Sequence, residues 1–94
     1  MALLRQDQVD EALRGDLSGW TQEGDAITRS VEAASFMGGV GLVQRVAEAA
    51  EEMNHHPDID IRWTTVTFTL STHSEGGLTE NDLALARKID SLAG

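Results

Sequence analysis

Three histidines are the residues of this chain best suited to chemistry near neutral pH. Two are adjacent, His55 and His56, and Pro57 follows them; the third, His73, comes after an apolar run rich in threonine. Imidazole exchanges protons near neutral pH more readily than other side chains, so clustered histidines suit general acid and base catalysis. The pattern predicts a proton-transfer pocket in which His55 and His73 converge.

A carboxylate lies close to the first two histidines. Glu51 precedes His55 by four residues, near the end of the longest helix that we expect. Side chains four apart on a helix can meet, so Glu51 is expected to orient the His55 imidazole. Proline disfavours helical backbone at the residue before it, so His56 leaves the helix and the neighbouring rings need not point the same way.

These features also have plain structural explanations. Glutamate and histidine four apart are common on helix surfaces, a histidine pair can cap a helix, and Asp82, three residues after Thr79, is a good capping residue. Trp63 on an apolar alternation fits a core residue better than a ligand platform. The histidines lack H-x-x-x-H and H-x-H spacings and the chain has no cysteine, so we expect no metal. No other cofactor is expected.

Length and charge restrict the classes of function. The chain has 94 residues and a net charge of −9, which suits one small domain over 1–94 with an acidic surface. Nucleic acids and anionic membranes attract basic faces, so direct binding to either is not expected. No apolar run approaches the roughly 20 residues of a membrane span. The first residues lack a signal-peptide layout, and we expect a cytoplasmic protein.

Two short elements are expected before the main helix. A helix over 8–14 would be capped by Asp7 and ended by Gly15. A hairpin would follow over 20–32, because apolar and polar residues alternate there around a Glu-Gly-Asp turn.

The main helix is expected to begin after Ser35, which is a good cap, and to end before Pro57. Apolar residues recur in it at spacings of three and four, which predicts one buried face. The side chains expected to face inward are Phe36, Val40, Val43, Ala47 and Ala50, with Val46 and Met53 beside them.

A second hairpin and a last helix complete the chain. Apolar residues occupy odd positions over 59–63 and even positions over 66–70, and this change of phase requires a turn near 64–65. The last helix would open with a Thr79 and Asp82 capping box. The fold class is therefore α+β, in the order α-β-β-α-β-β-α: a four-stranded antiparallel sheet with three helices packed on one face. Open sheet edges favour a homodimer or homotetramer.

The chemistry-bearing residues form a long pattern with fixed spacings. It reads Glu51, three residues, His55-His56-Pro57, five residues, Trp63, nine residues, His73, eight residues, Asp82. This pattern resembles the signature of the pterin-4a-carbinolamine dehydratases, and the segments 17–20, 69–73 and 77–79 are similar to that family too. The similarity covers about residues 7–92. The family's fold, helices on one face of a four-stranded antiparallel sheet, agrees with the order above.

The resemblance implies a reaction and a set of catalytic residues. The reaction removes water from 4a-hydroxytetrahydrobiopterin and gives quinonoid dihydrobiopterin, which recycles the pterin of aromatic amino acid hydroxylases. His55 and His73 would be the acid and base. His56 would bind and polarise the pterin, and Glu51 would orient the histidine pair.

The resemblance also implies a pterin-binding set. Asp82 would support the His73 side of the pocket, and backbone groups of Ser71 and Thr72 would meet the amide edge of the pterin. Trp63 takes the position of a tyrosine common in the family. Ile59 stands where some relatives have an aromatic residue, which reduces the expected affinity for the pterin more than the activity.

Two other functions stay open. Some family members bind a transcription factor and stabilise its dimer, so the chain could be a protein-binding module. It could also be an enzyme that acts on another pterin, such as a molybdopterin-related compound. The three histidines favour an enzyme over a pure binding module, but the sequence does not separate the two pterin substrates.

Overall fold

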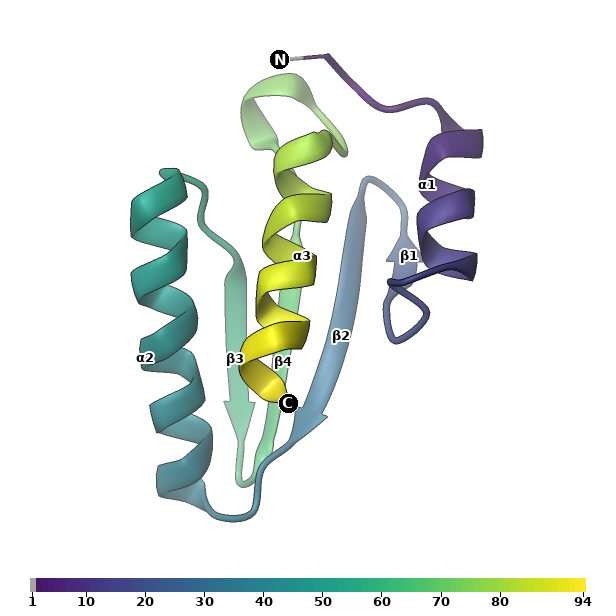
Figure 1. Cartoon of the computed structure of the whole chain (residues 1–94). Coiled ribbons are helices and arrows are strands. Elements are labelled where there is room, and N and C mark those ends of the chain that lie inside the picture. The colour runs from purple at the N-terminus through teal and green to yellow at the C-terminus, as the bar shows by residue number, and fades with distance from the viewer. Residues whose placement is uncertain (1) are drawn as a thin grey trace.

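A computed structural model describes residues 2–94 and shows a four-stranded sheet with three helices (Figure 1). The elements are α1 (Gln6–Arg14), β1 (Thr21–Glu23), β2 (Ala26–Glu32), α2 (Phe36–Met53), β3 (Asp58–Arg62), β4 (Thr65–Leu70), a short 3-10 turn η1 (His73–Glu75) and α3 (Glu80–Ala93). The strands lie in the order β1-β2-β4-β3, and every neighbouring pair is antiparallel. The predicted order of elements and the α+β class are confirmed.

The first helix begins earlier than the sequence predicted. α1 starts at Gln6 with Arg5 in the N-cap position, so Asp7 lies within the first turn and is not the cap. The reason is a local hydrogen bond: the Arg5 backbone amide donates to Gln8 Oε1 at 2.8 Å. Asp7 still favours the helix, because an acidic residue in the first turn interacts well with the helix dipole. Gly15 ends the helix, as predicted.

The inward face of α2 differs from the predicted one. Its buried residues are Gly39, Leu42, Val46, Ala49 and Ala50. A Cβ at Gly39 would lie 3.2 Å from Val66 Cγ2, so glycine there lets the helix approach β4 closely. Of the five residues predicted to face inward, only Ala50 is buried, and Val46, predicted beside them, is buried too.

The remaining four predicted residues form a half-exposed apolar strip on α2. Phe36 and Ala47 are exposed, while Val40 and Val43 are partly buried. A helix with apolar residues on two faces gives no single answer to periodicity, which explains the error. We call Phe36, Val40, Val43 and Ala47 the α2 strip.

The turn between β3 and β4 confirms the predicted change of phase. Arg62 pairs with Thr65 across a two-residue loop that contains Trp63. The expectation that Trp63 belongs to the core is wrong, because it is 77% exposed and has a positive φ of 53°. Its ring stacks on Phe36, with centroids 6.5 Å apart. Trp63 and Phe36 thus form an exposed aromatic pair at this end of the sheet.

The core lies between the sheet and the helices, and β4 is central to it. The fully buried residues include the even positions of β4, which are Val66, Phe68 and Leu70, and three residues of α3, which are Leu85, Ala86 and Ile89. Arg87 joins α3 to the α1 side by donating to Asp16 Oδ2 at 2.7 Å, and this hydrogen bond lowers the pKa of Asp16.

None of the helices within residues 2–94 has the length and apolar character needed to cross a membrane.

The topology places parts of three segments at one end of the domain. The last turn of α2, the loop after β4 and the first turn of α3 lie together at the top of Figure 1. The turn between β3 and β4, which carries Trp63, lies at the opposite end, near the start of α2 (Figure 1). The histidines that follow α2 and β4 therefore lie at the same end of the domain, although 18 positions separate His55 from His73.

Candidate active site

All three histidines line one pocket where α2 ends. The pocket has a volume of about 250 Å³, and its lining residues are Asn54, His55, His56, Ser71, Thr72, His73 and Ser74. His55 and His73 therefore line the same pocket. Each histidine is held in a different way.

The end of α2 decides where the first two histidines point. Asn54 adopts a left-handed conformation with φ 50° and ψ 45° and stops the helix, and asparagine is among the few residues that tolerate this conformation. His55 therefore leaves the helix, and the predicted contact between Glu51 and His55 is wrong. His56 returns toward the helix instead, with its Nε2 at 2.5 Å from Glu51 Oε2.

The pair of Glu51 and His56 is a surface contact. The two side chains are 77% and 55% exposed. Exposed ion pairs contribute little to stability, so this pair acts mainly on the orientation of His56.

His55 is paired with the carboxylate of Asp82, which the sequence had assigned to the His73 side. His55 Nε2 lies 2.6 Å from Asp82 Oδ1, and the two side chains are 10% and 0% exposed. Asp82 comes from the first turn of α3, so the contact joins that helix to the end of α2. It is a long-range contact, because the two residues are 27 positions apart.

The second carboxylate oxygen of Asp82 also accepts hydrogen bonds. Asp82 Oδ2 accepts the hydroxyl of Thr72 at 2.7 Å and the backbone amide of Thr79 at 2.9 Å. Thr72 has a single hydroxyl hydrogen, so the 2.8 Å contact between the two hydroxyls has Thr79 as its donor. Because Asp82 only accepts, His55 Nε2 is the donor in the His55–Asp82 pair. The buried carboxylate thus collects hydrogen bonds from α3, the loop after β4 and the end of α2.

This direction of hydrogen bonding leaves His55 Nδ1 for chemistry. No hydrogen bond from residues 2–94 reaches Nδ1, and no buried side-chain nitrogen or oxygen among them lacks a partner. Nδ1 therefore has contact with solvent, on a ring that lines the pocket. An imidazole fixed by a carboxylate on one nitrogen and open on the other is the arrangement used for general acid and base catalysis.

His73 is placed by its backbone alone. It is the first residue of η1 and is exposed, and its side chain makes no hydrogen bond with the described part of the chain. Two backbone bonds between Thr72 and Gly77, of 2.8 and 3.3 Å, close the loop around it. His73 can therefore turn toward a ligand.

The structure gives other contacts to Ser71 and Thr72, the two residues expected to offer backbone groups to the pterin. Ser71 Oγ donates to the Asp25 carbonyl at 2.7 Å, so its side chain faces the turn between β1 and β2. The Thr72 amide and carbonyl are both bonded within their own loop, which leaves little for a ligand. The structure instead gives Thr72 the task of donating its hydroxyl to Asp82.

Trp63 is not brought to the pocket, and neither is any other tryptophan or phenylalanine of the described residues. The pocket lining holds no tryptophan or phenylalanine. Trp20 and Phe68 are buried, while Phe36 and Trp63 stack on each other at the far end of the sheet. The flat surfaces that this chain offers to a ligand at the pocket are its imidazoles.

Two residues of the site were missed by sequence reasoning. Thr79 was assigned a capping role only, although its amide and hydroxyl both serve the Asp82 network. Asn54 was not singled out, although an asparagine just before the two histidines was a signal for a left-handed helix end. Residues 2–94 contain no group of three or more histidine, aspartate or glutamate side chains placed to hold a metal ion.

The pattern of the whole chain matches one protein family. The family model described as "Pterin 4 alpha carbinolamine dehydratase" matches residues 2–92. The chain belongs to this family. The resemblance seen in the histidine pattern is therefore confirmed, and it extends over nearly the whole chain.

Relatives that are provisionally named pterin-4-alpha-carbinolamine dehydratases support the membership. One from Mycobacteroides abscessus is 60% identical over 94 residues, which cover 100% of this chain and 99% of the relative. One from Nocardia farcinica is 63% identical over 91 residues, which cover 97% of this chain and 95% of the relative. These relatives have nearly the same length as this chain.

Two solved structures of the dehydratase family or its neighbours share the fold. A transcriptional coactivator/pterin dehydratase from Brucella melitensis has a TM-score of 0.92 and 38% identity, and the match covers 99% of this chain and 100% of that one. A pterin dehydratase-like protein, described as a RuBisCO assembly factor in the alpha-carboxysome, has a TM-score of 0.67 and 25% identity, with 80% and 87% covered. The fold thus occurs in proteins described by different functions.

Proposed function

We propose that this member of the dehydratase family converts 4a-hydroxytetrahydrobiopterin to quinonoid dihydrobiopterin and water. The observation that carries the proposal is the pocket in which His55, fixed by buried Asp82, and the exposed His73 both present an imidazole. The reaction needs one proton delivered and one removed, and two separately held imidazoles can supply both transfers.

The structure favours a division of labour between the histidines. His55 takes the proton from the ring nitrogen of the pterin at its Nδ1, because Asp82 stabilises the imidazolium that forms. His73 delivers a proton to the departing 4a-hydroxyl and regains it from solvent, because it is exposed. The carbon–oxygen bond breaks, a carbon–nitrogen double bond forms, and one water leaves. No metal or redox partner enters this balance.

Binding of the pterin depends on the rim of the pocket. His56, oriented by Glu51, contacts and polarises the substrate, and backbone groups near Ser71 meet its amide edge. The lining has no tryptophan, tyrosine or phenylalanine, and Ile59 stands where some relatives have an aromatic residue. We therefore expect a higher KM for the pterin than in relatives that have the aromatic residue, together with a similar kcat.

The purified chain should accelerate dehydration of the carbinolamine in a stopped-flow assay. General acid and base groups each contribute about 10²-fold or more, so the enzymatic rate should stand far above the unaided rate. The unaided dehydration must be measured in the same buffer and subtracted. Prior treatment with a chelator should leave the rate unchanged.

Two results would count against this function. One is a rate equal to the unaided rate for this substrate but an enhanced rate for another 4a-hydroxylated pterin, which would move the activity to that compound. The other is activity that is lost to the chelator and restored by zinc, which would make the histidines metal ligands.

We also propose that the chain forms at least a dimer in solution. The α2 strip leaves apolar side chains half-exposed on one helix, and β3 is an edge strand of the sheet; both features are covered in stable assemblies of small domains. Light scattering at micromolar concentration should give at least twice the monomer mass of 10.2 kDa. A mass near 10.2 kDa would contradict the proposal, and Val40→Asp should lower the mass if the strip is the contact.

A protein-binding module is the second candidate function. The observation that favours it is the exposed group of Phe36, Met37 and Trp63, which are 47%, 72% and 77% exposed. It lies at the opposite end from the histidine pocket, so a protein partner there would not block the pterin site. Unchanged dehydratase activity in Trp63→Ala would be consistent with this separation.

A further inference from the structure

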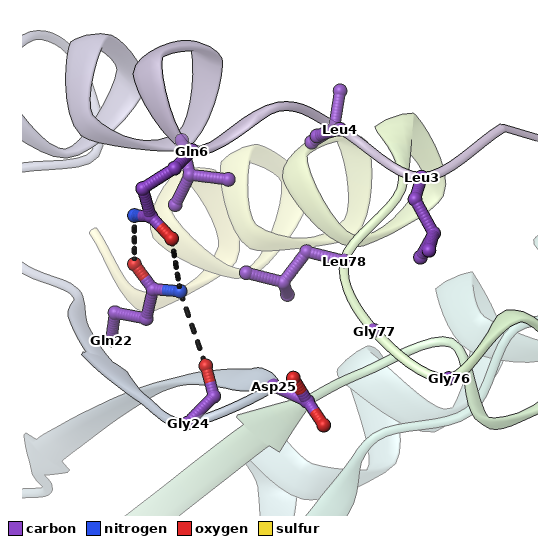
Figure 2. A pocket seen from close by; sticks show the side chains of 10 residues that line it. Leu3, Leu4, Gln6, Gln22, Gly24, Asp25, Gly76, Gly77 and Leu78 are labelled. Carbon is purple, nitrogen blue, oxygen red and sulfur yellow. Dashed lines mark hydrogen bonds between the residues drawn. The ribbon is translucent and has the colours of Figure 1, made fainter.

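The loop that carries His73 has a second side that faces the N-terminus. We call residues 71–79 the His73 loop. Its first half, through Ser74, lines the histidine pocket. Its second half, Gly76, Gly77 and Leu78, lines a separate cavity of about 140 Å³ (Figure 2). The His73 loop thus forms part of the lining of both the histidine pocket and this second cavity.

The first residues of the chain form the opposite wall of this second cavity. We call residues 2–5 the N-terminal strap. Figure 2 shows Leu3 and Leu4 on the strap, which runs across the segment from Gly76 to Leu78. The Leu4 amide donates to the Leu78 carbonyl at 2.8 Å. A Cβ at Gly77 would lie 3.1 Å from Leu3 Cδ2, which shows how closely the strap approaches the loop.

The His73 loop is attached to the rest of the domain at several points. The start of the loop is tied by Ser71 to the Asp25 carbonyl, and its two halves are tied by Thr72 and Gly77. Thr72 and Thr79 also bond to buried Asp82, and Leu78 packs in the core. These contacts fix the ends of the loop, and the strap adds a further attachment at Gly77 and Leu78.

This arrangement matters because the position of His73 follows its backbone. His55 is anchored through its side chain to Asp82, but no side-chain hydrogen bond within residues 2–94 fixes His73. A shift of the loop therefore moves the His73 imidazole directly. Displacement of a reacting group by about 1 Å can cost as much as 10²-fold in rate.

We propose that the N-terminal strap positions His73 for proton transfer by holding the His73 loop from behind. Leu3 and Leu4 are positioning residues: they touch the loop and not the substrate. The inference rests on the proposed function in that it takes His73 as a proton-transfer group. Its structural part, the restraint of the loop by the strap, can be measured without any substrate.

The test compares the full chain with a variant in which Met1 is followed directly by Arg5. Loss of one backbone hydrogen bond and a small apolar contact should raise hydrogen exchange at the Thr72 and Gly77 amides by about fivefold to tenfold. The ring signals of His73 should shift in the NMR spectrum, while those of His55 should stay in place. In the dehydration assay, kcat should fall by about tenfold, with KM nearly unchanged.

A milder pair of variants guards against general damage to the fold. Leu3→Ala removes a side chain that is 53% exposed, so the core is intact, and it should raise the same amide exchange by about twofold to threefold. Met37→Ala removes another exposed apolar side chain, 72% exposed and at the far end, and should leave Thr72 and Gly77 unchanged. Amides of β4 should stay protected in every variant.

The outcomes separate the two proposals. Unchanged exchange at Thr72 and Gly77 and unshifted His73 signals in the truncated chain would overturn the role of the strap. Altered exchange and shifted His73 signals with an unchanged kcat would keep the restraint but overturn the assignment of His73 to proton transfer. Equal effects of Leu3→Ala and Met37→Ala on amide exchange in the His73 loop would also overturn the proposed role of the strap.

Discussion

His55→Ala and His73→Ala should each slow the dehydration of 4a-hydroxytetrahydrobiopterin by about 10²-fold or more. Each variant removes one of the two imidazoles at which the pocket exchanges protons with the substrate. The loss should appear in kcat, because the proton transfers occur in the transition state and not on binding. Stopped-flow rates, corrected for the unaided reaction, measure it.

His56→Ala is the internal control for these variants. It removes a third imidazole from the same pocket, but one that is paired with exposed Glu51. Its effect should fall mainly on KM. Full activity in the His55→Ala, His73→Ala double variant would rule out the proton-transfer scheme, and a kcat loss in His56→Ala equal to that of His55→Ala would refute the division of roles.

Asp82→Asn should lower both activity and stability, although it changes only one atom. The amide group would have to place an N–H opposite either the His55 Nε2 donor or the Thr72 and Thr79 donors. In the first case His55 must adopt the other tautomer, which leaves Nδ1 unable to accept a proton. We expect kcat to fall by about 10²-fold or more. The free energy of unfolding should fall by about 2–3 kcal/mol, because a buried hydrogen-bond partner is lost.

Glu51→Gln is the matched control for Asp82→Asn. It makes the same chemical change at a carboxylate that also holds a histidine but is 77% exposed. Exposed pairs contribute about 0–1 kcal/mol, so urea unfolding should detect little change. Similar losses of stability in the two variants would show that the burial of Asp82 is not what matters.

The sequence predicted the elements well because their signals are local. The change of apolar phase between 59–63 and 66–70 predicted a turn, and the structure has it at Trp63 and Thr64. The glycine after α1 and the proline after α2 also marked their boundaries closely. The buried face of α2 was predicted wrongly because the helix is apolar on two sides, and packing against α3 and β4 decides which side is buried.

The site was harder to predict because its key contact is not local. Spacing favoured Glu51 as the partner of His55, since four residues separate them, but one left-handed residue, Asn54, turns His55 away. The partner of His55 is 27 positions along the chain. Pattern reasoning named Asp82 as a site residue, yet its contact with His55 depends on how α3 docks against α2.

The aromatic pair of Trp63 and Phe36 and the histidine pocket sit at opposite ends of α2, which with 18 residues is about 27 Å long. Substitutions at one end need not alter contacts at the other. Selection on the pocket and selection on the aromatic pair can therefore proceed independently in different lineages. A family with this layout can change the surface at the Trp63 end while its pocket chemistry stays constant, or lose that chemistry while the scaffold survives.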